Sequence, residues 1–477
     1  MTTKLGSHIP PRCTRRSGAC WRALASILVL AGLLSACGSQ QPPDAAPAAH
    51  PNVALILIDT LRADRVRAVR NGQLVMPFLA QLSSQGIYYP NAISPSSWTK
   101  PAMASLFTGV YPNAHGVIHS ARTEDPDHPT SDILAASWDT LAEHFAAAGY
   151  TTWGFQTNAN LTRPLGFAQG FAGGCYTFHN GAPARQVTDA ALMALPDLAA
   201  PFFLYAHYMD PHAPYRPAPE IEGALGPMPA LPDADRALLD DDERFMAYYL
   251  DQVKTAIGLQ PAPTLPDLTE AGKEAVRHRY DLECHATDRA VERLVTRIQT
   301  QHPETIIIIL SDHGEEFWER GGMGHGTTLH AEQVRVPLMI VEPDQRGEIR
   351  DESVSTLIIL EYLAGRLGLP LKTAPGPVLS YTRGPWPQLG IDQRSIVQGD
   401  YLLIDDRARQ RTTLYNLRLD PVEQEDLAEV QSAEADHLRG LLGHYLDAAP
   451  VAPADTAPLS ESDIEALEAV GYLDSGP

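Results

Sequence analysis

The strongest constraint on the fold comes from short segments made almost wholly of apolar residues. Four of them contain no charged side chain: Asn52–Ile58, Pro201–Ala206, Thr305–Leu310 and Val336–Val341. A strand buried on both faces of a parallel sheet has this pattern, whereas a half-exposed strand alternates apolar and polar residues. These segments therefore predict the strands of a mainly parallel central sheet.

Segments with helical periodicity lie between the predicted strands. The clearest are Thr140–Ala148 and Tyr280–Ile298, where apolar residues recur every three or four positions. Alternating strands and helices predict an α/β fold in which helices sandwich a central, mainly parallel sheet. The 477 residues are enough for one large domain with a smaller one attached.

The composition changes along the chain, and the changes predict its parts. A Pro-rich, acidic stretch is typical of an insertion, either a lid over the sheet edge or inert surface decoration, with a short helix near Phe245–Ile257. Near the C-terminus, shorter runs at Tyr401–Ile404 and Thr412–Leu417 predict antiparallel strands. We expect a catalytic domain over 52–394 with the insertion at 218–273, followed by a smaller C-terminal α+β subdomain over 395–477.

The first 36 residues have the composition of a targeting segment. A basic stretch ends at Arg22 and precedes a short apolar run that closes on Leu34-Ser35-Ala36-Cys37. Because this run is too short for a comfortable membrane span, we expect a cleaved signal peptide over 1–36. The closing residues resemble a bacterial lipobox, which predicts lipid on Cys37 and a flexible tether over 37–51. The alternatives are an uncleaved anchor or an ordinary signal sequence.

The N-terminal motif, the net charge and the cysteines each predict one further property: the location, the absence of a nucleic-acid partner and the possible disulfide. A lipid on Cys37 would hold the protein in the bacterial cell envelope, on its periplasmic or extracellular face. The net charge of −22 repels phosphate backbones, so we expect no nucleic-acid partner. Cys175 and Cys284 form one disulfide or remain two buried thiols, because sequence spacing does not show whether their Cα atoms approach.

Acidic residues follow two of the predicted strands where those strands end. Asp59 comes directly after the first strand, and Asp312 and His313 come just after the third. In α/β sheets, ligands bind outside the carboxyl ends of the strands. A carboxylate in such a buried position needs a cation or another partner to offset the loss of water. These three residues therefore predict a site for a divalent metal such as Ca, Mg, Mn or Zn.

Two further segments bring polar side chains to the same edge. Asp210 and His212 lie in a Pro-constrained loop after the second strand, and His325 stands between two glycines. Together these three are candidates for a second metal, and the two imidazoles are alternatively candidates for binding an anionic substrate. We interpret the other notable histidines as structural: His115, His207 and His330.

Several segments, in a fixed order, carry a resemblance to a known family. They are Asp59–Asp64, Ser105–Gly116, Asp210–Tyr215, Ser311–Glu315, Arg335–Leu338, and Leu414–Leu417 with Asp420-Pro421. Together they resemble the sulfatase family of the alkaline phosphatase superfamily. The resemblance implies a central sheet between helices, a smaller C-terminal domain, a divalent metal and an anionic ester substrate.

The expected nucleophile position departs from this family. Its members place a Cys or Ser, oxidised to formylglycine, two residues before a Pro and ten before a Gly that corresponds to Gly109. That position is Thr99 here. Threonine cannot become formylglycine, because the aldehyde requires a primary carbon. The family's arginine is replaced by Met103, its Lys-Trp-His element has no counterpart near Phe155–Asn158, and phosphodiesterases and phosphoethanolamine transferases of the superfamily do use Thr.

We therefore expect a metal-dependent hydrolase of sulfate or phosphate esters with Thr99 as its nucleophile. A divalent cation would lower the pKa of the Thr99 hydroxyl, and cationic or imidazole groups would neutralise the oxygens of the transferred group. The expected roles are metal binding by Asp59, Thr99, Asp312 and His313, and charge neutralisation by Lys100, His212 and His325. The alternatives are a phospho-group transferase and a non-catalytic lipoprotein that binds an anionic glycan.

Overall fold

The structure is a computed structural model that describes residues 50–123, 125, 128–172, 175–259, 263–343, 345–373, 376–447, 454–469 and 472. The predictions for the signal peptide, for Cys37 and for the tether as far as residue 49 lie outside these residues. Among the helices of the described residues, none is both long and apolar enough to cross a membrane.

The central sheet confirms the predicted α/β fold. Within the described chain it consists of β1 (Val53–Ile58), β4 (Ile87–Ile93), β6 (Thr151–Gln156), β7 (Tyr176–Phe178), β8 (Phe202–Tyr208), β9 (Ile306–Leu310), β12 (Arg335–Val341), β13 (Glu348–Ile349) and β14 (Val354–Ser355). The order is β13-β4-β12-β9-β1-β8-β6-β7, with β14 also beside β4. β1 pairs in parallel with β8 and β9, whereas β12 is antiparallel to β9 and β4. The sheet is mainly parallel with one reversed strand.

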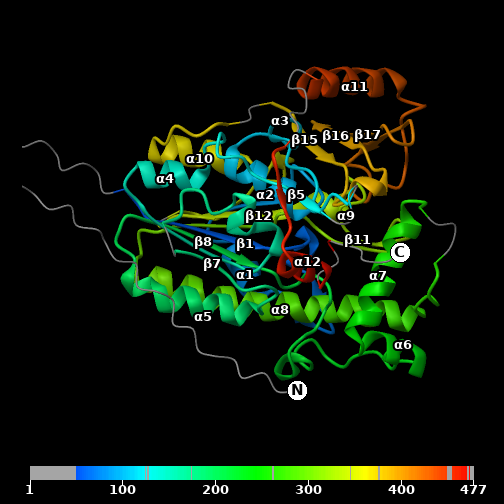
Figure 1. The fold of residues 1–477 in the computed structure, drawn as a ribbon, viewed down its shortest axis with the longest axis horizontal. Coiled ribbons are helices and arrows are strands. Elements are labelled where there is room, and N and C mark those ends of the chain that lie inside the picture. The colour runs from blue at the N-terminus through cyan, green and yellow to red at the C-terminus, as the bar shows by residue number, and fades with distance from the viewer. Residues whose placement is uncertain are drawn as a thin grey trace, which may run out of the picture.

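Helices cover both faces of this sheet (Figure 1). On one side lie α1 (Pro77–Leu82), α5 (Ala184–Ala194) and α8 (Glu270–Gln301), and on the other α2 (Thr99–Thr108), α4 (Leu141–Ala147) and α10 (Ile358–Leu367). Alternate residues of β1 enter different cores: Ile56 and Ile58 belong to the first, Leu55 and Leu57 to the second. Burial on both faces explains why the run contains no polar residue.

Both predicted helices form, with different agreement at their ends. α4 begins after Thr140, whose hydroxyl accepts a hydrogen bond from Glu143 N while the Glu143 carboxylate accepts from Thr140 N. This reciprocal capping explains the sharp start of the helix. α8 begins at Glu270, before the predicted start at Tyr280, and Thr269 caps it through a hydrogen bond from Gly272 N.

The region of residues 218–273 packs against the main core. Its helices are α6 (Asp233–Leu239) and α7 (Asp242–Ala256), and α7 confirms the predicted helix near Phe245. Phe245, Tyr248 and Tyr249 of α7 are buried in the core on the α8 side of the sheet. These contacts hold α7 beside the short hairpin β10 (Glu316–Phe317) and β11 (Met323–Gly324), which follows β9 at the sheet edge.

A second, antiparallel sheet confirms the predicted C-terminal strands. Its strands are β15 (Val378–Thr382), β16 (Gln393–Gln398), β17 (Tyr401–Asp406) and β18 (Arg411–Asn416), and α11 (Ser432–Asp447) covers one face. The first strand, β15, precedes residue 395, the expected start of this subdomain. The other face packs against the main domain through Val334, Val378 and Tyr415.

The described end of the chain returns from the second sheet to the main domain. β19 (Thr456–Pro458) pairs antiparallel with β5 (Thr130–Asp132), and α12 (Glu461–Glu468) follows. In Figure 1 this red segment lies well away from α11, over the body of the main domain. We call residues 454–469 together with Tyr472 the C-terminal tail.

Short elements complete the described fold. They are η1 (Ala63–Arg65), β2 (Val69–Arg70), β3 (Gln73–Leu74), α3 (Pro112–His115), η2 (Ala159–Leu161), η3 (Arg163–Leu165), η4 (Leu195–Asp197), η5 (Pro219–Ile221), α9 (Ala331–Val334) and η6 (Pro387–Leu389).

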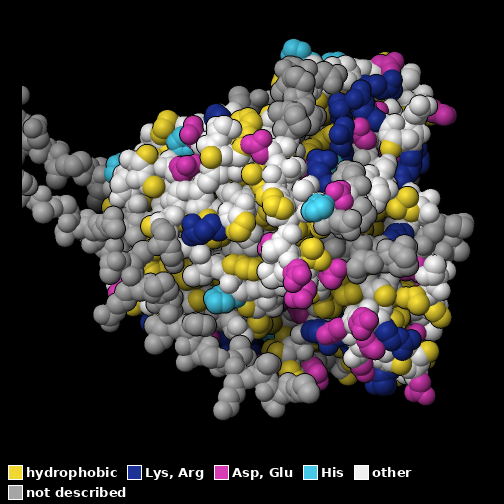
Figure 2. Space-filling model, viewed as in Figure 1, with side chains coloured by type: hydrophobic (Ala, Val, Ile, Leu, Met, Phe, Trp, Pro, Cys, Tyr) yellow, Lys and Arg dark blue, Asp and Glu magenta, His cyan; other side chains and the backbone are white. Residues whose placement is uncertain are grey.

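Charge is unevenly spread over the surface. Figure 2 shows Lys and Arg side chains together over the second sheet and acidic side chains around α12, whereas both kinds lie intermixed near α6 and α7.

The structure excludes a disulfide between the two cysteines of the body. Cys284 lies on α8 as an unpaired, fully buried thiol in the core that also contains Tyr280. Burial raises the pKa of this thiol well above its ordinary value. Cys284 is thus an apolar packing residue, and of the two alternatives left open by the sequence, the pair with Cys175 is excluded.

Candidate active site

The hydroxyl of Thr99 lies at the centre of the candidate site. Thr99 is the first residue of α2, and every residue of this helix is buried. Thr99 Oγ1 lies 3.1 Å from His313 Nε2, 3.3 Å from Asn158 Nδ2 and 3.0 Å from the Tyr472 hydroxyl. The helix start therefore presents this hydroxyl to groups from distant parts of the chain.

Asp59, Asp312 and His313 meet because β1 and β9 are parallel neighbours that end at the same edge. His313 Nε2 lies 3.5 Å from Asp59 Oδ1 and 3.5 Å from Asp312 Oδ2. Among the described residues, these three form the group whose acid and imidazole ligand atoms all lie within 4.8 Å of one another. Sequence analysis thus identified three side chains that the structure brings together.

The donor atoms of this group fit a divalent cation. Asp59 Oδ1 and Asp312 Oδ2 are buried and make no hydrogen bond within the described structure. Unpaired buried carboxylate oxygens are costly, and a bound cation offsets that cost. Two carboxylates, one imidazole and the adjacent Thr99 hydroxyl form a mixed oxygen and nitrogen set that suits several divalent metals.

Burial shapes the protonation of the cluster. For Asp59, burial acts to raise the pKa, but the hydrogen bond with His207 and the nearby imidazoles lower it overall. For Asp312, burial and the charge of Asp59 raise the pKa well above its ordinary value. Burial also lowers the pKa of His313 to about 3 and that of His325 to about 4, so both imidazoles are neutral near pH 7.

Two more imidazoles face the Thr99 hydroxyl. Nε2 of His212 and Nε2 of His325 each lie 3.2 Å from the Tyr472 hydroxyl, which itself contacts Thr99. The rings of the two histidines have centroids 4.9 Å apart. Glu315 Oε1 lies 3.1 Å from His325 Nδ1, which leaves Nε2 of that ring facing the site. The sequence-predicted histidines therefore converge on one point beside Thr99.

Two other predicted site residues point elsewhere. Lys100 Nζ donates to Ser131 Oγ and to the His119 carbonyl, and burial lowers the pKa of Lys100 to about 7. Successive residues of an α-helix point about 100° apart, so Lys100 turns away when Thr99 faces the cluster. Asp210 accepts a hydrogen bond from Ala184 N, 2.7 Å away, and burial raises its pKa to about 6. The structure thus does not bring Asp210 to the pair of imidazoles with which it was expected to bind metal.

The histidines interpreted as structural differ in their surroundings. His115 and His330 hydrogen-bond to side chains outside the cluster. His207 is buried, as expected of a core histidine, but its Nε2 lies 3.1 Å from Asp59 Oδ2. Its Nδ1 contacts the Tyr205 hydroxyl at 2.7 Å. This chain of contacts holds the Asp59 carboxylate in place.

Sequence analysis missed two side chains that contact Thr99. Asn158 follows β6 at the same sheet edge, and its Nδ2 donates to Asp59 Oδ2 at 2.8 Å and to Thr99 Oγ1 at 3.3 Å. Its position after a buried strand was the available signal. Tyr472, from the C-terminal tail, carried no comparable signal, because no strand or sequence motif marks it.

Replacing Asn158 by alanine is expected to lower turnover by about tenfold to hundredfold, the usual effect of losing a side chain that orients metal ligands. The variant removes the donor shared by Asp59 and Thr99 but leaves both in place. The measurement is kcat with a chromogenic ester, together with bound metal. Asn160→Ala is the matched control, because Asn160 is equally buried but accepts from Ser120 Oγ instead. Equal losses in the two variants would show a general packing effect.

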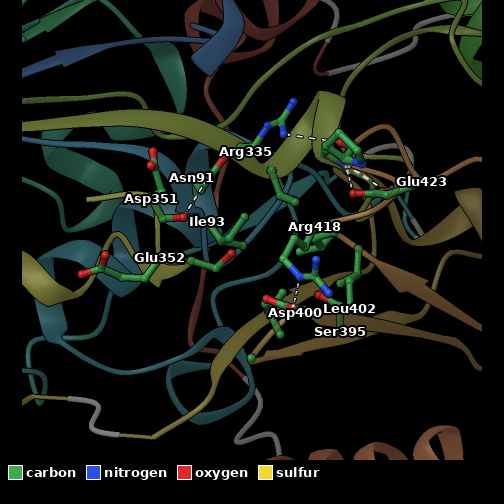
Figure 3. Close-up of a pocket in the computed structure, with 17 residues that line it drawn as sticks. Asn91, Ile93, Arg335, Asp351, Glu352, Ser395, Asp400, Leu402, Arg418 and Glu423 are labelled. Carbon is green, nitrogen blue, oxygen red and sulfur yellow. Dashed lines mark hydrogen bonds and ion pairs between the residues drawn. The ribbon is translucent and has the colours of Figure 1, made fainter. Parts of the chain in front are cut away.

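A separate cavity of about 630 Å³ lies between the main domain and the second sheet. Its polar side chains largely pair with one another: Arg418 forms an ion pair with Asp400 at 2.7 Å, and Asn91 donates to the Asp351 carbonyl at 2.9 Å (Figure 3). Neither Thr99 nor any side chain that contacts it lines this cavity. The chemistry-bearing groups therefore lie at the sheet edge rather than here.

Comparison with known proteins agrees with this geometry. A family model described as Sulfatase matches residues 51–369. The chain is 24% identical over 389 residues to the multifunctional alkaline phosphatase superfamily protein PehA of Trinickia caryophylli, across 66% of this chain and 74% of that protein. It is 22% identical over 466 residues to arylsulfatase K of Gallus gallus, across 84% of each. The phosphonate monoester hydrolase of Agrobacterium radiobacter shares the fold, with a TM-score of 0.61 and 18% identity over 83% of this chain and 95% of that one.

Proposed function

Because this chain belongs to the sulfatase family, whose members are metal-dependent ester hydrolases, we propose that it cleaves sulfate or phosphate esters with Thr99 as the nucleophile. One observation carries the proposal: a buried hydroxyl stands at the helix start, within hydrogen-bond distance of His313 and beside the predicted metal ligands. Threonine cannot become formylglycine, and the intact Thr99 hydroxyl lies where a nucleophile would be needed.

The site residues divide into two groups around Thr99. Asp59, Asp312 and His313 would hold a divalent cation, which when bound would offset the carboxylate charge and favour loss of the Thr99 proton. Asn158 donates to Thr99 Oγ1 and so stabilises negative charge on that oxygen. The metal ligands and Asn158 would therefore activate the Thr99 hydroxyl as a nucleophile.

The second group consists of His212 and His325, which would bind the oxygens of the transferred phosphate or sulfate group. His212 and His325 point their Nε2 atoms at one position next to Thr99, and each ring would donate a hydrogen bond to an oxygen of the transferred group once it is protonated at Nε2. Thr99 Oγ1 gives up its proton to solvent and attacks phosphorus or sulfur, and the bond to the ester oxygen breaks, so that the alcohol leaves with a proton taken from water. Water then cleaves the ester formed on Thr99, which releases phosphate or sulfate and restores the hydroxyl. We leave Lys100 out of this step, since its ammonium group contacts Ser131 and His119.

We expect phosphate esters to be the better substrates. The chain has Thr99 at the family's formylglycine position and Met103 in place of the family's arginine. In the resemblance, the formylglycine and the arginine are features of enzymes that hydrolyse sulfate esters. The test measures metal content and turnover of 4-nitrophenyl sulfate, 4-nitrophenyl phosphate and bis(4-nitrophenyl) phosphate by the full chain. Faster turnover of a phosphate substrate, with unmodified Thr99 by mass spectrometry, supports the proposal.

Two other functions are distinguished by the same experiment. Metal binding without turnover of any ester would favour the glycan-binding alternative. Consumption of an ester only when an alcohol acceptor is added would favour a phospho-group transferase. Turnover of sulfate alone by a protein with modified Thr99 would contradict the nucleophile assignment.

We also propose that lipid on Cys37 anchors the protein to the bacterial cell envelope, on the evidence of the Leu34–Cys37 motif. Cys37→Ser should move the protein out of the membrane fraction or leave it uncleaved, because the acylated thiol is lost. The measurement is fractionation followed by mass analysis of the N-terminus. Turnover per molecule should stay unchanged, as Cys37 lies before the first strand of the domain. Unaltered membrane association would refute the anchor.

A further inference from the structure

The hydroxyl of Tyr472 lies inside the catalytic cluster. Its oxygen is 3.0 Å from Thr99 Oγ1 and 3.2 Å from Nε2 of both His212 and His325. The side chain is almost completely buried, and its ring centroid lies 5.8 Å from that of Trp98. Tyr472 therefore contacts the nucleophile and both imidazoles to which the proposed function assigns the transferred group.

Tyr472 and a substrate cannot occupy this position together. A phosphorus or sulfur atom attacked by Thr99 carries three further oxygens, and these need the space directly beside Thr99 Oγ1. In the structure, that space holds the Tyr472 hydroxyl at hydrogen-bond distance from Thr99 and from both imidazoles. No atom fits between partners at such distances. Turnover therefore requires Tyr472 to move.

We propose that the C-terminal tail is an internal competitor of the substrate, with the Tyr472 phenol occupying the position of the transferred group until the tail detaches. This inference rests on the proposed function, because it takes Thr99, His212 and His325 as the groups that substrate must reach. The tail then lowers the apparent affinity for substrate by the fraction of molecules in which the site is open.

The attachment of the tail is suited to reversible release. Of the eight residues of α12, only Leu467 is buried. A helix of this length is marginal without tertiary contacts. A cavity of about 900 Å³ lies between α12 and α7, and Glu465 and Glu468 line it on the tail side. On its packed side α12 contributes buried Leu467 and partly buried Ile464 and Ala466, and on its other side it faces open space. A short helix with one buried residue is typical of segments that open locally.

Other contacts bring the phenol back to the same position. β19 pairs with β5 and tethers the start of the tail to the main domain. Trp386 Nε1 donates a hydrogen bond to the Tyr472 carbonyl, next to the buried ring. Ser460 begins α12 with a capping box, in which its hydroxyl accepts from Asp463 N. The tail is thus held by specific contacts, and it can rebind after release.

The Tyr472 hydroxyl occupies the position of the transferred group and does not act as an acid catalyst. Its position against Thr99 Oγ1 is that of the group under attack, not of an oxygen leaving on the far side. We therefore expect loss of this hydroxyl to help turnover and not to impair it.

Two variants of the full chain test whether the tail lowers activity, as proposed, or supports it. Tyr472→Phe removes the hydroxyl that contacts Thr99 and both imidazoles in the closed state. Leu467→Ala removes the buried anchor of α12 while leaving every site residue intact. Both should raise kcat/KM for bis(4-nitrophenyl) phosphate, by about tenfold for Tyr472→Phe. Tyr445→Phe, at an exposed residue of α11, is the matched control and should leave kcat/KM unchanged. Unchanged or lower kcat/KM in both variants would overturn the proposal.

A second measurement does not depend on turnover. Inorganic phosphate that binds at Thr99 should displace Tyr472, so hydrogen exchange at the amides of α12 should speed up at phosphate concentrations that saturate the site. If phosphate binds by calorimetry and leaves this exchange unchanged, the tail does not compete. A chain that hydrolyses no ester but shows the phosphate-dependent exchange would contradict the proposed function alone, and the two ideas are thus judged separately.

Discussion

Thr99→Ala is expected to lower kcat by at least about 10⁴-fold, because removal of a nucleophile removes the covalent step. Bound metal should be largely retained, since a neutral hydroxyl contributes less to affinity than the carboxylates of Asp59 and Asp312. The measurement is single-turnover kinetics with bis(4-nitrophenyl) phosphate, together with metal content. Turnover at the native rate would mean that the metal cluster activates water directly.

The matched control lies on the same helix. Thr108→Ala also removes a buried hydroxyl from α2, but that hydroxyl donates only to the Ala104 carbonyl. Its activity should stay close to that of the native protein. Thr99→Ser should keep part of the activity, because the attacking oxygen is retained and only the methyl group that restricts the side-chain rotamer is lost. Together the three variants separate the hydroxyl from the packing of the helix.

Asp312→Asn is expected to lower turnover by at least about 100-fold and to reduce bound metal, because it removes a charged oxygen ligand from the cluster. Asparagine can still accept, through Oδ1, the hydrogen bonds from Thr60 N at 3.3 Å and His313 N at 2.9 Å. The fold should therefore survive. Full activity of metal-depleted Asp312→Asn protein would end the metal model.

The same variant has a second, opposite effect on stability. Burial and the charge of Asp59 raise the pKa of Asp312 in the metal-free protein. Ionisation of a group with a raised folded-state pKa costs stability as the pH increases. The substitution removes that cost, so the metal-free variant should melt at a higher temperature than the metal-free native protein at pH 8. Asp132→Asn is the contrasting variant: burial acts to raise the pKa of Asp132, but its hydrogen bond with Arg122 lowers that pKa overall, so this substitution should lower the melting temperature at pH 8.

The sequence alone predicted four strands of the central sheet, β1, β8, β9 and β12, and the three metal-ligand candidates. The run before Asp59 and the run before Asp312 consist almost wholly of apolar residues, and this local property does not depend on how the rest of the chain folds. Parallel neighbouring strands end at one edge, so the residues that follow β1 and β9 had to lie close together. That β1 and β9 are parallel neighbours is a property of the tertiary structure, so the sequence identified Asp59, Asp312 and His313 as candidates and the fold brought them together.

Side-chain direction was beyond the reach of sequence patterns. Lys100 follows Thr99 directly, yet its ammonium group contacts Ser131 while the Thr99 hydroxyl faces the site. That difference depends on where helix α2 begins and how it is rotated against the sheet. In the same way, the reversed direction of β12 follows from its pairing with β4 and β9, and not from the apolar residues it contains.

The tertiary structure alone decided which distant groups complete the site. Asn158 lies 59 positions from Thr99 and Tyr472 lies 373 positions from it, and both contact the same oxygen. A local pattern reports burial and backbone conformation, because these depend on neighbouring residues. Contacts between distant segments depend on the packing of the whole chain, which here returns the tail to the sheet edge through β19 and β5. The sequence therefore identified the residues at the ends of the strands, whereas the folded chain determined which distant side chains meet them.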